Sequence, residues 1–344
     1  MPHSSFHSML ELVNNRSHQW REIVLGRDVP LSLLPVDGKY PFLESITMHY
    51  TFPPSPDSPI LSFRDAPRLH DVHMMIYTTR IELPWHQLTR FRTDEIDIED
   101  CLELLRRSYN LADAQLKIPM FGSSALPTDT IILPQLQSLY LSGPWHDEGG
   151  QDHDQAAQTI PTALLKCLKT PALKTLILGF MDCRSTVCDI SPFLSFSSQS
   201  PFQLHTLKLF FVPATVDALI DCLKATPTLI HLQLQISRHI LDLNPLFAKF
   251  TGPSDFLPKL ESLHVALIVN PSIVDAALVL SALVWRCISA PEVRLKNFRF
   301  TVSTGFRDYD EYFNSIKSHS VYAILEASET DLYIGKKTKE YSFM

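Results

Sequence analysis

One short pattern of apolar and polar positions recurs along the chain. It has the form Pro-x-Leu-x-x-Leu-x-Leu and is clear at residues 134–141. Related copies, some with a substitution, occupy residues 171–178, 202–209, 227–234 and 258–265. In each copy the last two apolar residues stand two positions apart, which is the alternation of a strand with one buried face. The pattern therefore predicts a short strand in every copy.

Weaker copies extend the array toward both ends of the chain. They lie at residues 41–48, 67–74, 88–91, 111–116 and 295–300. The first leucines of successive copies are separated by between 19 residues, from Leu69 to Leu88, and 37 residues, from Leu136 to Leu173. This spacing is typical of leucine-rich repeats with insertions. Because so short a strand can bury its apolar side only against neighbours, we expect a stacked array.

The segments between the copies show helical periodicity in several places. Residues 99–107, 162–168 and 216–223 each lead into the next copy, and they place Cys101, Cys167 and Cys222 at equivalent buried positions. Proline then ends the helix and starts the next strand segment, because it disfavours the helical conformation in the residue before it. Helix and strand are thus predicted to alternate.

These elements predict an α/β fold, an irregular solenoid like that of leucine-rich repeats, with a parallel concave sheet and convex helices and loops. The position that carries Asn or Cys in regular repeats holds other residues here, so we expect a loosely curved horseshoe. Residues 1–30 are predicted to form an N-terminal helical cap, residues 31–305 the solenoid, and residues 306–344 a C-terminal cap and tail.

Composition narrows the classes of function. The 344 residues are 45% hydrophobic and carry a formal net charge of −7, which gives no general field for binding nucleic acid. The alternating basic and aromatic residues from Arg294 to Phe300 fit single-stranded nucleic acid, but they equally fit a last strand, which we predict. Gly 10 against Pro 25, with no phosphate-binding or nucleophile-elbow motif, argues against an enzyme and against a cofactor.

The chain is expected to be cytoplasmic or nuclear. Its six cysteines form no C-x-x-C, and its first residues lack the pattern of a secretory signal. The longest apolar stretch, from Val274 to Trp285, contains Asp275 and is shorter than the roughly 20 residues that span a bilayer. We therefore expect no membrane partner.

The richest polar cluster runs from His146 to Asp154. Its histidines and carboxylates could supply metal ligands, and a metal-dependent or hydrolytic enzyme using this loop is the alternative hypothesis. The cluster matches neither H-E-x-x-H nor a calcium-binding loop, and it falls in the longest interval of the array. We interpret it as a solvated insertion and predict no metal site and no catalytic residues.

Several segments of the sequence, taken in order, resemble those of one protein family. They are Ser17–Leu25, Pro41–Ile46, Asp65–Leu69, Leu83–Thr89, Cys101–Leu111 and Leu257–Leu263. From about residue 10 to about residue 300 the chain resembles the leucine-rich-repeat region of the F-box-like proteins of mushroom-forming fungi. In this resemblance the segment from Ser17 to Leu25 corresponds to the helix that follows the F-box.

The resemblance implies a substrate-recognition subunit whose repeats hold a ubiquitination target. In the family, the F-box binds the Skp adaptor of a cullin-RING ubiquitin ligase. The residues before Ser17 are too few for a three-helix F-box. The resemblance is therefore to the repeat region with the F-box itself missing, and it implies Skp and cullin partners only if an F-box is restored.

The strand alternation also predicts a binding surface. The residue between the last two apolar positions must point away from the core, and in a parallel array such residues line up across the concave sheet. They are Thr47, His73, Arg92, Gln115, Tyr140, Ile177, Lys208, Gln233, His264 and Arg299. We expect the last six of these to bind a protein partner, because Tyr140 and Ile177 are apolar anchors beside Lys208, His264 and Arg299.

This set contains no carboxylate, although Asp+Glu 37 exceeds Lys+Arg 30 in the whole chain. The face is therefore expected to be locally neutral to positive, and to favour an acidic or phosphorylated peptide or loop. The alternative is a face that simply stays solvated, since exposed strand positions are polar in any case.

Overall fold

The dominant element of the computed structural model is a 12-stranded sheet whose strands follow one another in chain order. The structure describes residues 12–26, 39–49, 61–79, 81–118, 129–143, 160–180, 191–211, 214–236, 241–252, 255–268, 274–289, 294–302 and 309–336. Every neighbouring pair of strands in the sheet is parallel. The predicted α/β class with a parallel sheet is confirmed.

The strands are short. In spatial order they are β1 (Glu22–Leu25), β2 (Ser45–Met48), β4 (Asp71–Met74), β6 (Arg90–Thr93), β7 (Asp113–Lys117), β9 (Ser138–Ser142), β11 (Thr175–Gly179), β12 (Thr206–Phe210), β13 (His231–Ile236), β14 (Ser262–Leu267), β15 (Asn297–Val302) and β16 (Asp331–Lys336). Two further parallel pairs join β3 (Leu61–Ser62) to β5 (Ile81–Glu82) and β8 (Ile131–Ile132) to β10 (Leu168–Lys169).

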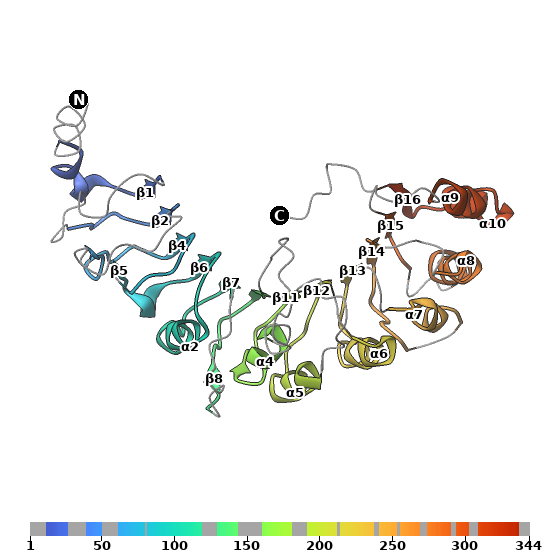
Figure 1. Ribbon diagram of the computed structural model, residues 1–344, viewed down its shortest axis with the longest axis horizontal. Coiled ribbons are helices and arrows are strands. Elements are labelled where there is room, and N and C mark those ends of the chain that lie inside the picture. Colours follow the sequence, from blue (N-terminus) through green and yellow to red (C-terminus); the bar gives the residue numbers. More distant parts are fainter. Residues whose placement is uncertain are drawn as a thin grey trace, which may run out of the picture.

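Helices cover one face of the sheet. They are α2 (Ile98–Arg107), α4 (Ile160–Leu165), α5 (Ser191–Gln199), α6 (Val216–Lys224), α7 (Asn244–Lys249), α8 (Ala276–Val284), α9 (Tyr309–Lys317) and α10 (Ser320–Glu326), with short helical turns η1 (Ser17–Gln19), η3 (Trp85–Gln87) and η5 (Trp285–Ser289). Figure 1 shows the strands along the inner side of an arc and the helices along its outer side. None of the described helices is long and apolar enough to cross a membrane.

The core lies between the strands and the helices. The apolar strand residues of the five clear copies are all buried, with at most 5% of their surface exposed. They are Leu139, Leu141, Leu176, Leu178, Leu207, Leu209, Leu232, Leu234, Leu263 and Val265. The last strand predicted from sequence is present as β15, and its Phe298 and Phe300 are fully buried. The predicted alternation is therefore confirmed.

A proline turn explains the Pro-x-Leu part of the pattern. The N–H of Leu173 donates to the carbonyl of Thr170 at 3.2 Å, which closes a four-residue turn with Pro171 in its second position. Proline favours this position because its ring sets the φ angle that the turn requires. The same bond joins Leu229 to the residue before Pro227, at 3.1 Å. Each turn brings the buried leucine into the core just before its strand begins.

A hydrogen-bond fork then sets the register of each strand. The N–H groups of Lys174 and Thr175 both donate to the carbonyl of Gln137, at 2.9 Å each. The N–H groups of His205 and Thr206 donate in the same way to the carbonyl of Lys174, at 2.8 and 2.9 Å. The fork recurs from β2 to β15, so successive strands start at the same level although the repeats differ in length.

Helices are present at the three places predicted from periodicity, although α4 ends at Leu165 and Leu168, predicted to be helical, lies in β10; the three cysteines are buried. Cys101 is in α2, Cys222 is in α6, and Cys167 follows the end of α4. Burial raises the pKa of the Cys101 thiol to about 12. These three thiols therefore act as small core residues.

The helical interpretation of residues 22–25 is wrong. A helical turn covers residues 12–14 and η1 follows it, but the chain then forms β1, which pairs with β2. Ile23 and Leu25 are buried while Glu22 and Val24 are exposed, so the alternation has the period of a strand. At the other end, β16 pairs with β15. Both segments predicted to be caps thus contribute strands to the same sheet.

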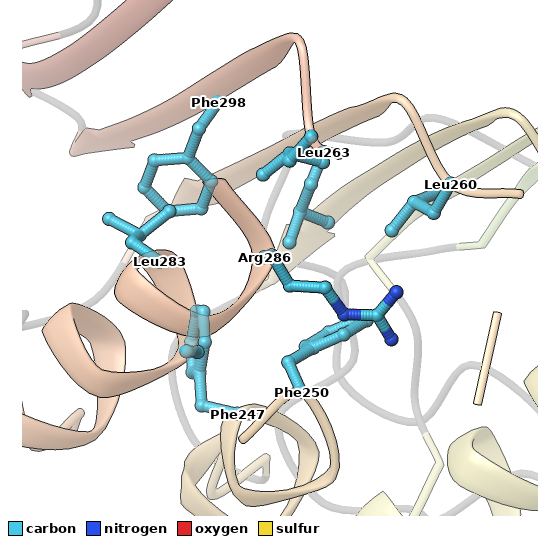
Figure 2. Close-up of a pocket in the computed structure, with 9 residues that line it drawn as sticks. Phe247, Phe250, Leu260, Leu263, Leu283, Arg286 and Phe298 are labelled. Atoms are coloured by element: carbon cyan, nitrogen blue, oxygen red, sulfur yellow. The ribbon is translucent and has the colours of Figure 1, made fainter. Parts of the chain in front are cut away.

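A buried arginine joins two neighbouring repeats near the C-terminal end. Arg286, in η5, is 4% exposed, and its guanidinium lies 5.0 Å from the centre of the Phe250 ring (Figure 2). Its Nη1 donates to the carbonyl of Leu257 at 3.2 Å, and its Nη2 donates to the carbonyl of Phe256. Leu257 has φ 49°, a left-handed conformation that is uncommon for a branched side chain. Arg286 therefore stabilises the turn at Leu257, which leads into β14.

We predict that Leu207→Ala lowers the free energy of unfolding by about 2–5 kcal/mol, because it removes a fully buried side chain from the centre of the array. Chemical denaturation followed by circular dichroism measures the change. Thr206→Ala, at the neighbouring half-buried position on the other face, serves as the control. Equal losses for the two variants would contradict the assignment of the core.

Candidate functional site

The predicted concave residues form one continuous row. In the pairing of the strands, each of them lies directly opposite the next. This central row consists of Val24, Thr47, His73, Arg92, Gln115, Tyr140, Ile177, Lys208, Gln233, His264, Arg299 and Tyr333. All of them keep solvent-exposed surface, and they alternate along their strands with residues whose side chains point into the core, so they lie on the opposite face of the sheet.

Sequence reasoning missed the two ends of the central row. Val24 lies opposite Thr47, and Tyr333 lies opposite Arg299. Both stand next to buried residues in a period-two alternation, but neither segment carries the Pro-x-Leu turn. The alternation by itself was the signal that could have identified them.

A ladder of ion pairs covers the concave face of β4, β6 and β7. Asp71 pairs with Arg90 at 2.6 Å, and Asp113 pairs with Arg92 at 3.5 Å. Lys117 adds a third pair, with Asp94, at 2.6 Å. The first two pairs join neighbouring strands, and Asp94 of the third pair directly follows the end of β6.

These carboxylates bring to the face negative charge that the central row alone lacks. The prediction considered only the central row, but the residue two positions earlier in each strand shares the same face. Asp71, Asp113 and Asp331 occupy that first row, and the last two pair with Arg92 and Arg299. Both arginines therefore have an internal counter-charge, which the alternation within a single strand does not predict.

Two histidines lie beside the ladder. The rings of His49 and His73 are edge to face with their centres 6.1 Å apart. Burial lowers the pKa of His73, and the negative charge of Asp94 partly opposes this effect. Among the residues that the structure describes, no group of three or more His, Cys, Asp or Glu side chains could hold a metal ion.

The concave face of β9 and β11–β15 has a different composition. We call the first and central rows on these strands the carboxylate-free segment, since none of their side chains is acidic. The segment consists of Ser138, Thr175, Thr206, His231, Ser262 and Asn297 in the first row, and Tyr140, Ile177, Lys208, Gln233, His264 and Arg299 in the central row. It contains all six residues predicted to bind a partner.

The positive groups of this segment differ in their partners. Lys208 makes no ion pair with any described residue and is half-buried. Arg299 donates from Nη2 to Oδ2 of Asp331, on β16, at 3.0 Å. His264 Nε2 lies 3.2 Å from the hydroxyl of Thr301. Lys208 is therefore the cation that this segment presents without a counter-charge from the described part of the chain.

The residues two positions after the central row are tightly packed. Ser142, on β9, is 1% exposed and lies directly opposite Gly179, on β11. A Cβ atom added to Gly179 would lie 2.8 Å from Ser142 Cβ and 3.7 Å from the hydroxyl oxygen of Tyr140. Glycine at this position thus allows β11 to pack closely against Ser142 of β9.

The proposed alternative site could not be located. The loop from His146 to Asp154 lies outside the described residues.

The comparisons with known proteins found no protein-family model that matches the chain and no significant match among curated proteins.

We predict that Gly179→Ala lowers the free energy of unfolding by about 1–3 kcal/mol, because the new methyl group overlaps Ser142 Cβ. Thermal or chemical denaturation measures the loss. Adding Ser142→Gly removes the opposing Cβ and should restore most of the stability. A double variant no more stable than Gly179→Ala alone would show that this contact is not the cause.

Proposed function

We propose that the chain is a leucine-rich-repeat solenoid and acts as a non-catalytic module for binding a protein partner. The observation that carries this proposal is the central row, which runs in register across every strand of the 12-stranded sheet and stays accessible to solvent. Solenoids of this type use their extended concave surfaces for binding.

The physical properties of the concave face support this role. Each central-row side chain stands on a strand that hydrogen-bonds to its neighbours, so the surface is ordered before a partner arrives. A preordered surface reduces the entropy lost on binding. Tyr140 and Ile177 supply large contact area next to Lys208, and aromatic residues of this kind are enriched among residues that dominate binding energy.

The family resemblance supports a more specific role. We infer that the chain is the substrate-recognition part of an F-box-type ubiquitin-ligase receptor, or an F-box-less relative of such a receptor. In that role the concave face holds the ubiquitination target, and an F-box would supply the contact with Skp and cullin.

We predict that Ile177→Arg abolishes capture of the partner, because it places a long charged side chain at the middle of the central row. The measurement is quantitative mass spectrometry of proteins that co-purify with the tagged chain from cells. Leu194→Arg is the matched control, since Leu194 is 38% exposed on α5, on the outer side of the arc. Partners lost equally from both variants would contradict binding by the concave face.

The ligase role has its own test. An F-box fused before Ser17 should recruit Skp and cullin, and the captured partner should then be ubiquitinated in a reconstituted reaction. The same fusion carrying Ile177→Arg should recruit Skp but leave the partner unmodified. A partner that binds the fusion normally and is never ubiquitinated would refute the receptor role, while leaving the binding role intact.

A further inference from the structure

We propose that the carboxylate-free segment binds an extended acidic stretch of the partner protein, whose carboxylates lie about four residues apart. One carboxylate meets Lys208 and the other meets Arg299. This inference rests on the proposed function, because it specifies the chemistry of the partner for the same concave surface.

The first argument is the distribution of charge. Acidic residues outnumber basic ones in the chain, 37 to 30, yet none lies in the two accessible rows of β9 and β11–β15. Those rows present Lys208 and Arg299 together with hydroxyl, amide and imidazole groups. Hydrogen-bond donors and positive charge are complementary to an anionic chain, and the carboxylate that contacts Arg299 comes from outside the segment, from Asp331 on β16.

The second argument is the contrast with the other half of the face. There, Arg90, Arg92 and Lys117 each have a carboxylate of the neighbouring repeat within 3.5 Å. An acidic ligand would have to displace three internal carboxylates there, whereas on the carboxylate-free segment it displaces only Asp331 from Arg299, and no described carboxylate pairs with Lys208. The ladder therefore marks where the acidic binding surface ends, and the surface begins at β9.

The third argument is the spacing of the two cations. Lys208 and Arg299 are separated by three steps across the sheet, from β12 through β13 and β14 to β15. At about 4.8 Å per strand the separation is about 14 Å, which an extended peptide covers in about four residues. Single, separated cations suit separate carboxylates, whereas a phosphate group is typically held by clustered arginines.

The neighbouring apolar residues add a third point of contact. Ile177 lies one strand from Lys208, and Tyr140 lies two strands away, on the side opposite Arg299. These steps of about 5–10 Å correspond to about two or three residues of extended chain. The partner should therefore carry an apolar side chain about two or three residues from the acidic residue that meets Lys208.

Asp331 acts as an internal competitor for the second carboxylate. It holds Arg299 at 3.0 Å, and its side chain is 58% exposed against 25% for Arg299. An exposed ion pair of this kind contributes little to stability, so an incoming carboxylate can replace Asp331 at small cost. Removing the charge of Asp331 should therefore strengthen binding.

The test uses fluorescein-labelled peptides of about nine residues and fluorescence anisotropy with the whole chain. One peptide carries a leucine and two glutamates at the inferred spacing; a second has glutamine in place of both glutamates; a third has the glutamates adjacent. The first should bind at least about fivefold more tightly than the others, and its affinity should fall at high salt. Equal affinity for the first and second peptides would overturn the proposal.

Matched variants locate the contact. Lys208→Gln should weaken binding of the first peptide about fivefold, while Lys224→Gln, on the outer helix α6, should leave it unchanged. Asp331→Asn should tighten binding by about two- to fivefold, while Asp113→Asn, which releases Arg92 in the ladder, should not. Equal effects within either pair of variants would refute the assigned site.

Two outcomes separate this inference from the proposed function. If a peptide with phosphoserine in place of the first glutamate binds and the glutamate peptide does not, the carboxylate assignment is wrong. If no acidic peptide binds but Ile177→Arg still abolishes capture of the cellular partner, the inference fails while the concave surface remains the binding site.

Discussion

The whole structure depends on a strand that is too short to be stable alone. Each strand of the clear repeats buries only two or three side chains on one face, such as Leu207 and Leu209 of β12, and gains a core only when parallel neighbours extend that face. The parallel direction forces the chain to return on the opposite side, where helices close the core (Figure 1). The same stacking leaves the first and central rows of the other face accessible to solvent, and these rows form the candidate binding surface.

The register of the strands is set locally, at the start of each repeat. The turn at Pro171 and the fork of N–H groups on the Gln137 carbonyl position β11 directly against β9, after the longest interval in the array. Repeats of different length can therefore follow one another without disturbing the alignment of the central row. The missing Asn or Cys of regular repeats does not prevent this alignment, because backbone groups supply the bonds.

The alternation of residues predicted most of the fold and of the central row. A buried leucine such as Leu176 and its exposed neighbour Ile177 differ by one position, and that difference determines which face each side chain occupies. The strand β1 was missed because the family resemblance assigned Ser17–Leu25 to a helix, and β16 was missed because residues 306–344 were interpreted as a cap and tail. The pairing of Arg299 with Asp331 was missed because the two residues lie on adjacent strands. The pattern of residues within one strand does not show which side chains of the next strand are close enough to pair.

The central claim is that the row through Tyr140 and Gln233 is the surface that contacts a protein partner. Site-specific photo-crosslinking tests it directly, with a benzoylphenylalanine at Tyr140 or Gln233 and at the outer positions Ile132 or Leu194, which are 58% and 38% exposed. The account predicts covalent crosslinks to the partner from the two concave positions and none from the two outer positions. Crosslinks from Ile132 or Leu194 alone would contradict it.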